Sequence, residues 1–136
     1  MENLNSLREA ESQLLAEEAV KLLSEKLALN IKMFDVREYT SVTDFYVNCT
    51  GKSGSHVISL ADDVADHFSE RDFAPLRVEG KQGNSWILVD FGQLIVNIFD
   101  SESRGFYSFD RLLPPETERE TEAIIREVDK NLGRVV

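Results

Sequence analysis

Apolar residues recur every three or four positions near the start of the chain, a spacing that predicts an amphipathic helix over residues 6–28. Residues 31–37 instead alternate apolar and polar side chains, and residues 44–50 are rich in β-branched and aromatic ones. Both patterns predict β-strands, because such side chains fit a pleated, half-buried surface. The apolar positions of the helix are Leu7, Leu14, Leu15, Ala19, Leu22, Leu23 and Leu27.

A second helical pattern begins near Ser55, with Ser53 or Ser55 as its N-cap. Its apolar face consists of Val57, Leu60, Ala61, Val64 and Phe68, and we expect His56, Ser59, Asp63, Asp66 and His67 to face solvent. Three further strands are predicted to begin at residues 74, 85 and 94. The short connections between them favour antiparallel hairpins.

The last third of the chain predicts helical segments rather than strands. Residues 101–113 suggest a turn and a short, partly helical segment, which Pro114 and Pro115 close. Residues 116–133 predict a terminal helix, with Thr117 and Glu120 spaced as a capping box. We therefore predict one domain over residues 1–113 and a helical extension over residues 114–136.

The order of these elements predicts the fold class α/β (α+β). One strand-helix-strand crossover combined with hairpins requires a mixed sheet. We expect five strands, with helices covering at least one face.

Composition narrows the class of partner. The chain has 136 residues, which fit one domain, and its 25 acidic against 15 basic residues give a net charge of −10. Such a charge repels phosphate backbones and anionic lipids, so it favours a basic protein partner over direct nucleic-acid readout or membrane binding. The single cysteine, Cys49, and an acidic N-terminus without a secretory pattern lead us to expect a cytoplasmic protein.

The stretch Thr50–His56, TGKSGSH, lies between a predicted strand and a predicted helix, as does the end of a phosphate-binding loop. A P-loop needs a glycine five positions before Gly51, and Tyr46 stands there instead. The loop is therefore too short to wrap a triphosphate. An anion could still dock on free amides at the start of the helix.

Other catalytic patterns are also missing. A metal-bound nucleotide needs two carboxylates on one strand face, but neither Glu79 nor Asp90 has an acidic neighbour two positions away. His56 and His67 are about 16 Å apart along one helix, too far to share a metal ion. Asp63 and His67 could hold a weak ion, although a solvated face is the commoner meaning of such a pair. We expect no enzymatic activity, no cofactor and no metal.

Aromatic residues are concentrated late in the chain: Trp86, Phe91, Phe99, Phe106, Tyr107 and Phe109. Beside Arg104, Asp110 and Arg111 they fit either sheet packing or the anchor of an interface. Composition alone leaves both interpretations open.

Three segments together resemble a known family. Residues 40–64, 75–80 and 85–113 are similar in order and spacing to the ribosomal silencing factors, also called Iojap-like proteins, and the resemblance covers about residues 14–113. It implies a sheet distantly like that of nucleotidyltransferases without their catalytic acids. It also implies binding to the large ribosomal subunit through ribosomal protein L fourteen, which sterically blocks joining of the small subunit and lowers translation when nutrients are scarce.

The resemblance also assigns residues. We expect Trp86, Asp90, Arg104, Phe106 and Tyr107 to make the ribosomal contact, and Leu112 to lie in the core. The matching positions are Thr43, Asp44, Gly51, Ser53, His56, Glu79, Gly80, Trp86, Asp90, Gly92, Phe99, Arg104, Tyr107 and Leu112. The chain departs from the family at Gln93, Asn97, Ser55 and Leu113, where Asp, His, Arg and Trp are common.

Three questions stay open at this level. The resemblance favours a homodimer, yet the leucine face of the first helix could equally cover the sheet. A nucleotidyltransferase-like remnant could bind a nucleotide at residues 50–56. An adaptor or assembly factor for another basic protein is a further alternative.

Overall fold

The computed structural model describes residues 11–134, in which helices and strands follow the predicted order up to residue 113. The helices are α1 (Ser12–Glu25), α2 (Gly54–Glu70), α3 (Ser101–Tyr107) and α4 (Glu122–Asn131), with short 3-10 helices η1 (Phe109–Leu112) and η2 (Pro115–Thr117). The strands are β1 (Leu29–Asp35), β2 (Phe45–Gly51), β3 (Arg77–Glu79), β4 (Trp86–Asp90), β5 (Leu94–Asp100) and β6 (Glu118–Arg119).

The strands form one mixed sheet in the order β3-β4-β5-β2-β1-β6. Only β2 and β5 are parallel, and their pairing follows from the crossover through α2 and the β3–β4 hairpin. The neighbouring pairs are antiparallel, including the two predicted hairpins β3–β4 and β4–β5. The predicted mixed sheet is thereby confirmed.

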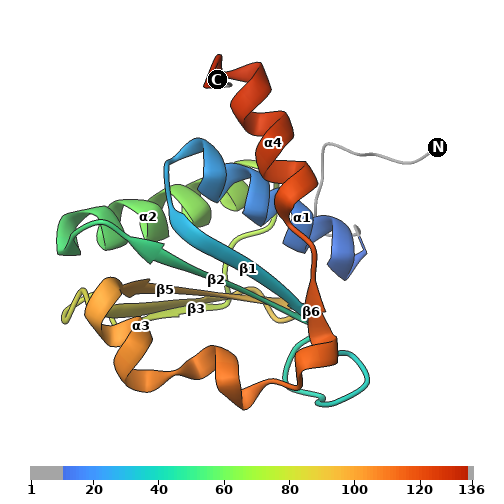
Figure 1. Cartoon of the computed structure of the whole chain (residues 1–136). Helices are drawn as coiled ribbons and strands as arrows, with labels where there is room; N and C mark the ends of the chain where they lie inside the picture. Colours follow the sequence, from blue (N-terminus) through green and yellow to red (C-terminus); the bar gives the residue numbers. More distant parts are fainter. Residues whose placement is uncertain (1–10, 135–136) are drawn as a thin grey trace.

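Helices cover both faces of this sheet. In Figure 1, α1 and α2 lie over one face, and α3 lies on the other. The first face is apolar, because every second residue of the central strands contacts α1 and α2 in a single core cluster. This cluster contains Val47 and Cys49 of β2, and Val96 and Ile98 of β5, all fully buried.

The helix α1 uses its predicted apolar face to cover the sheet. Leu15 and Leu23 are fully buried in the core cluster, whereas Leu14 points outward and is 54% exposed. The predicted start of this helix, residues 6–10, lies outside the described part of the chain. Its predicted end at residue 28 was too late, because Leu27 adopts a positive φ of 68° that stops the helix.

The helix α2 begins at Gly54 and is capped by Ser53, one of the two predicted caps. The Ser53 hydroxyl accepts a hydrogen bond from the His56 amide. The prediction that His56 faces solvent was wrong, since it is half-buried and its ring bonds the Lys52 amide and the Lys26 carbonyl. His67 is half-buried as well, at 2.8 Å from a carboxylate oxygen of Glu18.

The C-terminal region differs most from the prediction. Residues 118–119 form β6, a sixth strand that pairs with the edge of β1, where five strands had been expected. The helix α4 therefore starts at Glu122 rather than near residue 116, and the expected capping box does not form. The hydroxyl of Thr117 donates to the Pro114 carbonyl instead. Pairing with an open sheet edge outweighs the local helix preference here.

The helix α4 packs back onto α1, beside which it runs in Figure 1. Val128 is 3% exposed at this contact, and Ile124 and Ile125 pack against the core cluster. Beyond α4, the Arg134 guanidinium donates to the carbonyls of Ser24 and Glu25, which end α1. These contacts join the predicted extension to the body of the fold.

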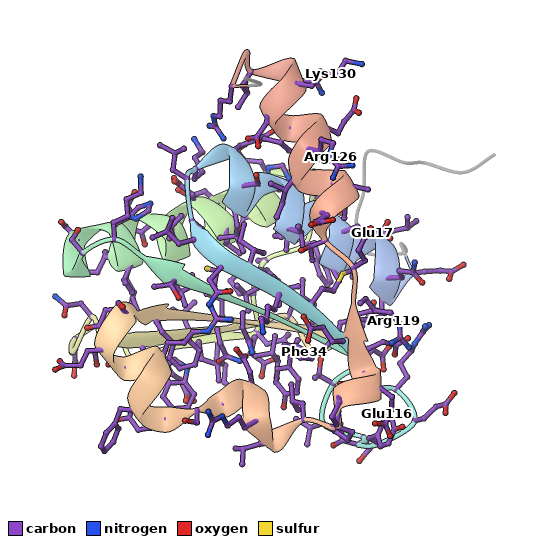
Figure 2. The ribbon with its side chains drawn as sticks, viewed as in Figure 1. Glu17, Phe34, Glu116, Arg119, Arg126 and Lys130 are labelled. Atoms are coloured by element: carbon purple, nitrogen blue, oxygen red, sulfur yellow. The ribbon has the colours of Figure 1, made fainter. Side chains whose placement is uncertain are left out.

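The segment before α4 is also tied to the sheet. The Tyr39 hydroxyl, in the loop between β1 and β2, donates to Glu116 over 2.9 Å. Figure 2 shows Glu116 and Arg119 beside this loop, whereas Arg126 and Lys130 lie farther along α4.

A prediction follows from the β3–β4 hairpin. Gly80 has a φ of +93°, and a Cβ built there would lie 2.1 Å from the Trp86 carbonyl oxygen. We expect Gly80→Ala to lower the free energy of unfolding by at least about 1–3 kcal/mol, the usual cost of backbone strain. Gly105→Ala is the control, because nothing lies near its Cβ and a helical alanine should add about 0.5–1 kcal/mol. Urea titration would measure both, and equal stabilities would contradict this account.

A second prediction concerns the contact between α4 and α1. Val128→Ala removes buried methyl groups and should lower the free energy of unfolding by about 1–3 kcal/mol. Leu132→Ala, at a position 52% exposed, should change it by less than about 0.5 kcal/mol. Thermal unfolding of the full chain checks both, and a neutral Val128→Ala would mean that α4 does not pack on α1 in solution.

Candidate functional site

The segment α3–η1 crosses the sheet face that α1 and α2 leave uncovered (Figure 1). The Asp100 carboxylate caps α3 by accepting from the Ser103 amide over 2.7 Å. The helix ends at Ser108, whose φ of 52° is left-handed and turns the chain into η1. These two local signals place the aromatic residues of α3 and η1 over strands β4, β5 and β2.

Aromatic rings from five elements meet at this position. The Trp86 ring on β4 lies 4.9 Å from Phe99 on β5 and 4.8 Å from Tyr107 on α3. Phe109 of η1 lies 6.0 Å from Trp86 and packs edge-on against Tyr46 at 5.2 Å. Aromatic pairs at these separations favour tilted and edge-on geometry, so the cluster is ordered and not a loose apolar patch.

The outer part of this cluster is open to solvent. Phe106 is 80% exposed, Leu112 is 75% exposed and Tyr107 is 48% exposed. We call the surface formed by Trp86, Phe106, Tyr107, Phe109 and Leu112 the aromatic face. Large exposed apolar side chains beside buried aromatic ones are typical of a protein-binding surface.

Leu112 corrects an expectation. It was predicted to lie in the core, yet it lies at the end of η1 with three quarters of its surface exposed. The 3-10 helix is too short to present a buried face, and Phe109 occupies the inner position. Phe109, which was not among the predicted contact residues, is therefore part of the same surface.

Arg104 lies beneath the aromatic face rather than on it. Its side chain is 9% exposed, and its guanidinium forms an ion pair with Asp110 at 2.8 Å. Its remaining contacts are the Thr50 hydroxyl at 3.0 Å and the Asn30 carbonyl at 2.7 Å. That carbonyl is free because β1 changes register between Leu29 and Lys32. Arg104 thus joins α3 and η1 to β1 and β2.

Asp90 lies at the opposite end of β4 from Trp86, about 13 Å away along the strand. Its carboxylate accepts from the Gly92 amide and from the Arg77 side chain. Burial, together with the charge of Asp90, raises the pKa of Tyr46. The structure therefore brings Trp86, Phe106 and Tyr107 together, with Arg104 below them and Asp90 apart, at the β4–β5 turn.

The family departures occupy different environments. Asn97 is 1% exposed and Gln93 is half-buried, whereas Ser55 lies on the surface and Leu113 is half-buried. Asn97 accepts from the Trp86 indole over 3.0 Å and donates to Asn48 over 3.1 Å. The change from a common His to Asn therefore affects the interior beneath the aromatic face. Two asparagines inside apolar strands were the sequence signal for this polar interior.

The turn at residues 50–56 contains only Lys52 and Ser53 between β2 and α2. The amides of Lys52 and His56 donate to the His56 ring and the Ser53 hydroxyl, and the Val57 amide donates to the Ser53 carbonyl. A Cβ at Gly51 would lie 2.7 Å from the Val57 side chain. Three amides that an anion could have used are already bonded within the chain, so the expectation of free amides fails for them.

The interior holds no activated cysteine. Burial raises the pKa of the Cys49 thiol to about 12, so the sulfur is protonated at neutral pH. Within residues 11–134 no three His, Cys, Asp or Glu side chains are grouped closely enough to hold a metal ion. No helix in the same range is long and apolar enough to cross a membrane.

A sequence model of the family "Ribosomal silencing factor during starvation" matches residues 9–134. The chain belongs to this family. The match extends beyond residue 113 through β6 and α4, farther than the resemblance seen in the sequence alone. The family name describes its members as ribosomal silencing factors, which implies ribosome-associated regulation of translation.

Relatives and a solved structure agree with this membership. The ribosomal silencing factor RsfS of Haemophilus influenzae is 37% identical over 61% of this chain and 81% of its own. A mouse protein named "Mitochondrial assembly of ribosomal large subunit protein 1" is 27% identical over 68% of this chain and 42% of its own. A crystal structure of a Chromobacterium violaceum protein has a TM-score of 0.73 and 26% identity, over 75% of this chain and 85% of that one.

A prediction separates the buried arginine from an exposed neighbour. Arg104→Leu leaves the Asp110 carboxylate without its cationic partner and should lower the free energy of unfolding by about 3 kcal/mol. Arg111→Leu, at an exposed position seven residues on, should change it by less than about 0.5 kcal/mol. Guanidinium titration checks both, and similar values for the two variants would contradict the buried role of Arg104.

Proposed function

We propose that this protein binds the large ribosomal subunit through ribosomal protein L fourteen and sterically blocks joining of the small subunit. The protein would act in the cytoplasm as a repressor of translation. This mechanism needs no chemical turnover, only an occupied surface and a bound body that collides with the small subunit.

Family membership is the first support for this proposal. The chain belongs to the ribosomal silencing factors, and the name of the mouse relative refers to the large ribosomal subunit. Ribosome silencing and the large ribosomal subunit thus both appear in the names of proteins related to this chain. We propose that they apply to this chain.

The aromatic face is the observation that supports the proposal most directly. Phe106 and Leu112 are large apolar residues with at least three quarters of their surface exposed. Phe106 lies next to the ordered Trp86–Tyr107 pair, and Leu112 ends η1, the 3-10 helix that begins with Phe109. Exposed aromatic anchors beside a rigid cluster supply most of the free energy in many protein interfaces. We propose Phe106, Tyr107 and Trp86 as direct contacts, Asp90 as a peripheral one, and Arg104 as a support for the surface.

The charge of the chain fits a basic partner. A net charge of −10 would attract a basic ribosomal protein and speed the encounter, whereas it would repel exposed RNA. The buried aromatic contact would then supply affinity. A nucleotide-binding enzyme is the weaker alternative, since the amides of Lys52, His56 and Val57 are occupied within the chain.

The proposed mechanism needs no more than one copy of the chain. The leucine face of α1, one candidate for a homodimer interface, covers the sheet of its own chain. A homodimer would need another surface.

Assembly of the large subunit is a second candidate function, which the name of the mouse relative favours. Both functions would use the same docking surface but differ in the particle bound. A silencing factor binds mature large subunits, and an assembly factor binds their precursors. Sedimentation of the protein with each particle distinguishes the two.

The variant Phe106→Ser/Leu112→Ser tests the proposal. Loss of two interface anchors should weaken binding to purified large subunits by about 30-fold or more, because each anchor contributes roughly 1 kcal/mol or more. The wild-type protein should also reduce the formation of joined ribosomes from separated subunits, and the variant should not. Sedimentation and light scattering measure the two effects.

Leu14→Ser is the matched control, because Leu14 is 54% exposed and lies on α1, which covers the opposite face of the sheet from the aromatic face (Figure 1). It should bind and inhibit joining as the wild-type protein does. Undiminished binding by the Phe106→Ser/Leu112→Ser variant would remove the aromatic face from the proposal. If the wild-type protein did not bind large subunits, the proposal as a whole would be contradicted.

A further inference from the structure

A continuous series of hydrogen bonds runs beneath the aromatic face. The Trp86 indole donates to the Asn97 side chain over 3.0 Å, and Asn97 donates to the Asn48 side chain over 3.1 Å. Asn48 donates to one carboxylate oxygen of Asp110 over 2.7 Å. The other carboxylate oxygen accepts from Arg104. We call Asn97, Asn48 and Asp110 the amide relay.

The relay connects the two parts of the chain that form the aromatic face. Trp86 lies on β4, whereas Phe106, Tyr107 and Leu112 lie on α3–η1. Asn97 and Asn48 are directly paired across β5 and β2, and both are essentially inaccessible to solvent. Buried side-chain amides are strongly oriented by their partners, because an unpaired donor or acceptor costs free energy there.

The carboxylate of Asp110 fixes the direction of every bond in the relay. An ionised carboxylate only accepts, so Asn48 must turn its NH₂ group toward Asp110 and its oxygen toward Asn97. Asn97 must then donate to Asn48 and present its own oxygen to the indole N–H. Each amide orientation follows from the one before it, and the last one holds the Trp86 ring.

We propose that Asp110, Asn48 and Asn97 are positioning residues that hold Trp86 and the α3–η1 segment in the conformation that docks on the ribosomal protein. This inference rests on the proposed function of the aromatic face. The relay touches no partner itself. It acts by holding Trp86 and the α3–η1 segment in a fixed relative position before binding, which lowers the entropic cost of association.

The variant Asp110→Asn reverses the relay without removing any side chain. An amide at position 110 has one acceptor, which Arg104 would retain, so its NH₂ group would face Asn48. Asn48 and then Asn97 must flip, and the Trp86 indole N–H then faces another donor. Because Trp86 is the only tryptophan, its indole N–H gives a single NMR signal. We expect its exchange with solvent to accelerate about tenfold or more, and binding to large subunits to weaken about tenfold.

The reciprocal double variant Asn48→Asp/Asp110→Asn should restore both measurements. A carboxylate at position 48 accepts from Asn97 and from the new amide at position 110, which still offers its oxygen to Arg104. The original orientation of Asn97 then returns. Glu102→Gln is the control, because it also removes one negative charge but at an exposed position on α3. It should leave both measurements unchanged. If Asp110→Asn does not fold, Asn97→Leu removes the indole acceptor while leaving the Arg104–Asp110 ion pair, and the same two effects are expected.

The outcomes separate this inference from the proposed function. If the Trp86 indole N–H of Asp110→Asn exchanged with solvent at the wild-type rate, the relay would be overturned whatever the ribosome assay gives. The same holds if the double variant did not restore the wild-type rate. Faster indole exchange with unchanged binding would overturn its positioning role. Failure of the proposed function is seen separately, as absence of wild-type binding to large subunits.

Discussion

The parallel pairing of β2 with β5 is the constraint on which the rest of the structure depends. Seven consecutive residue pairs, from Phe45–Leu94 to Gly51–Asp100, place two strands distant in sequence side by side at the centre of the sheet. Because side chains alternate along both strands, this register directs Val47, Cys49, Val96 and Ile98 toward α1 and α2. The same register pairs Asn48 with Asn97 on the other face. This one strand pairing thus creates the apolar core on one face of the sheet and, on the other face, the buried polar pair Asn48–Asn97 beneath the aromatic face.

The two faces are stabilised by different physical effects. The face under α1 and α2 gains from burial of apolar surface, which tolerates small changes of side-chain direction. The face under α3–η1 depends on the Arg104–Asp110 ion pair and the amide relay, in which each donor needs one particular acceptor. Such a network costs desolvation but specifies one arrangement. A protein that acts by docking needs a surface of fixed shape, and this network supplies it.

Much of the fold up to residue 113 was predictable from the sequence, because periodicity reports directly on which side of an element is buried. The Ser53 cap, the two hairpins and the apolar faces of α1 and α2 all followed from local patterns. The candidate site was less predictable. Trp86 and Tyr107 were found through their aromatic character and the family resemblance. Phe109 and Asp110 were noted in the same segment without an assigned contact, and Asn48 was missed. The roles of Phe109, Asn48 and Asp110 depend on contacts between residues up to 63 positions apart.

The sequence by itself determined the elements up to residue 113, the acidic character of the chain and the family. Only the tertiary structure decided that Arg104 lies in the interior, that Leu112 lies on the surface and that residues 118–119 join the sheet. The physical reason is the same in each case. Hydrophobic period and capping residues are properties of a local segment, whereas an ion pair, an exposed end of η1 and a sixth strand depend on which distant segment lies opposite.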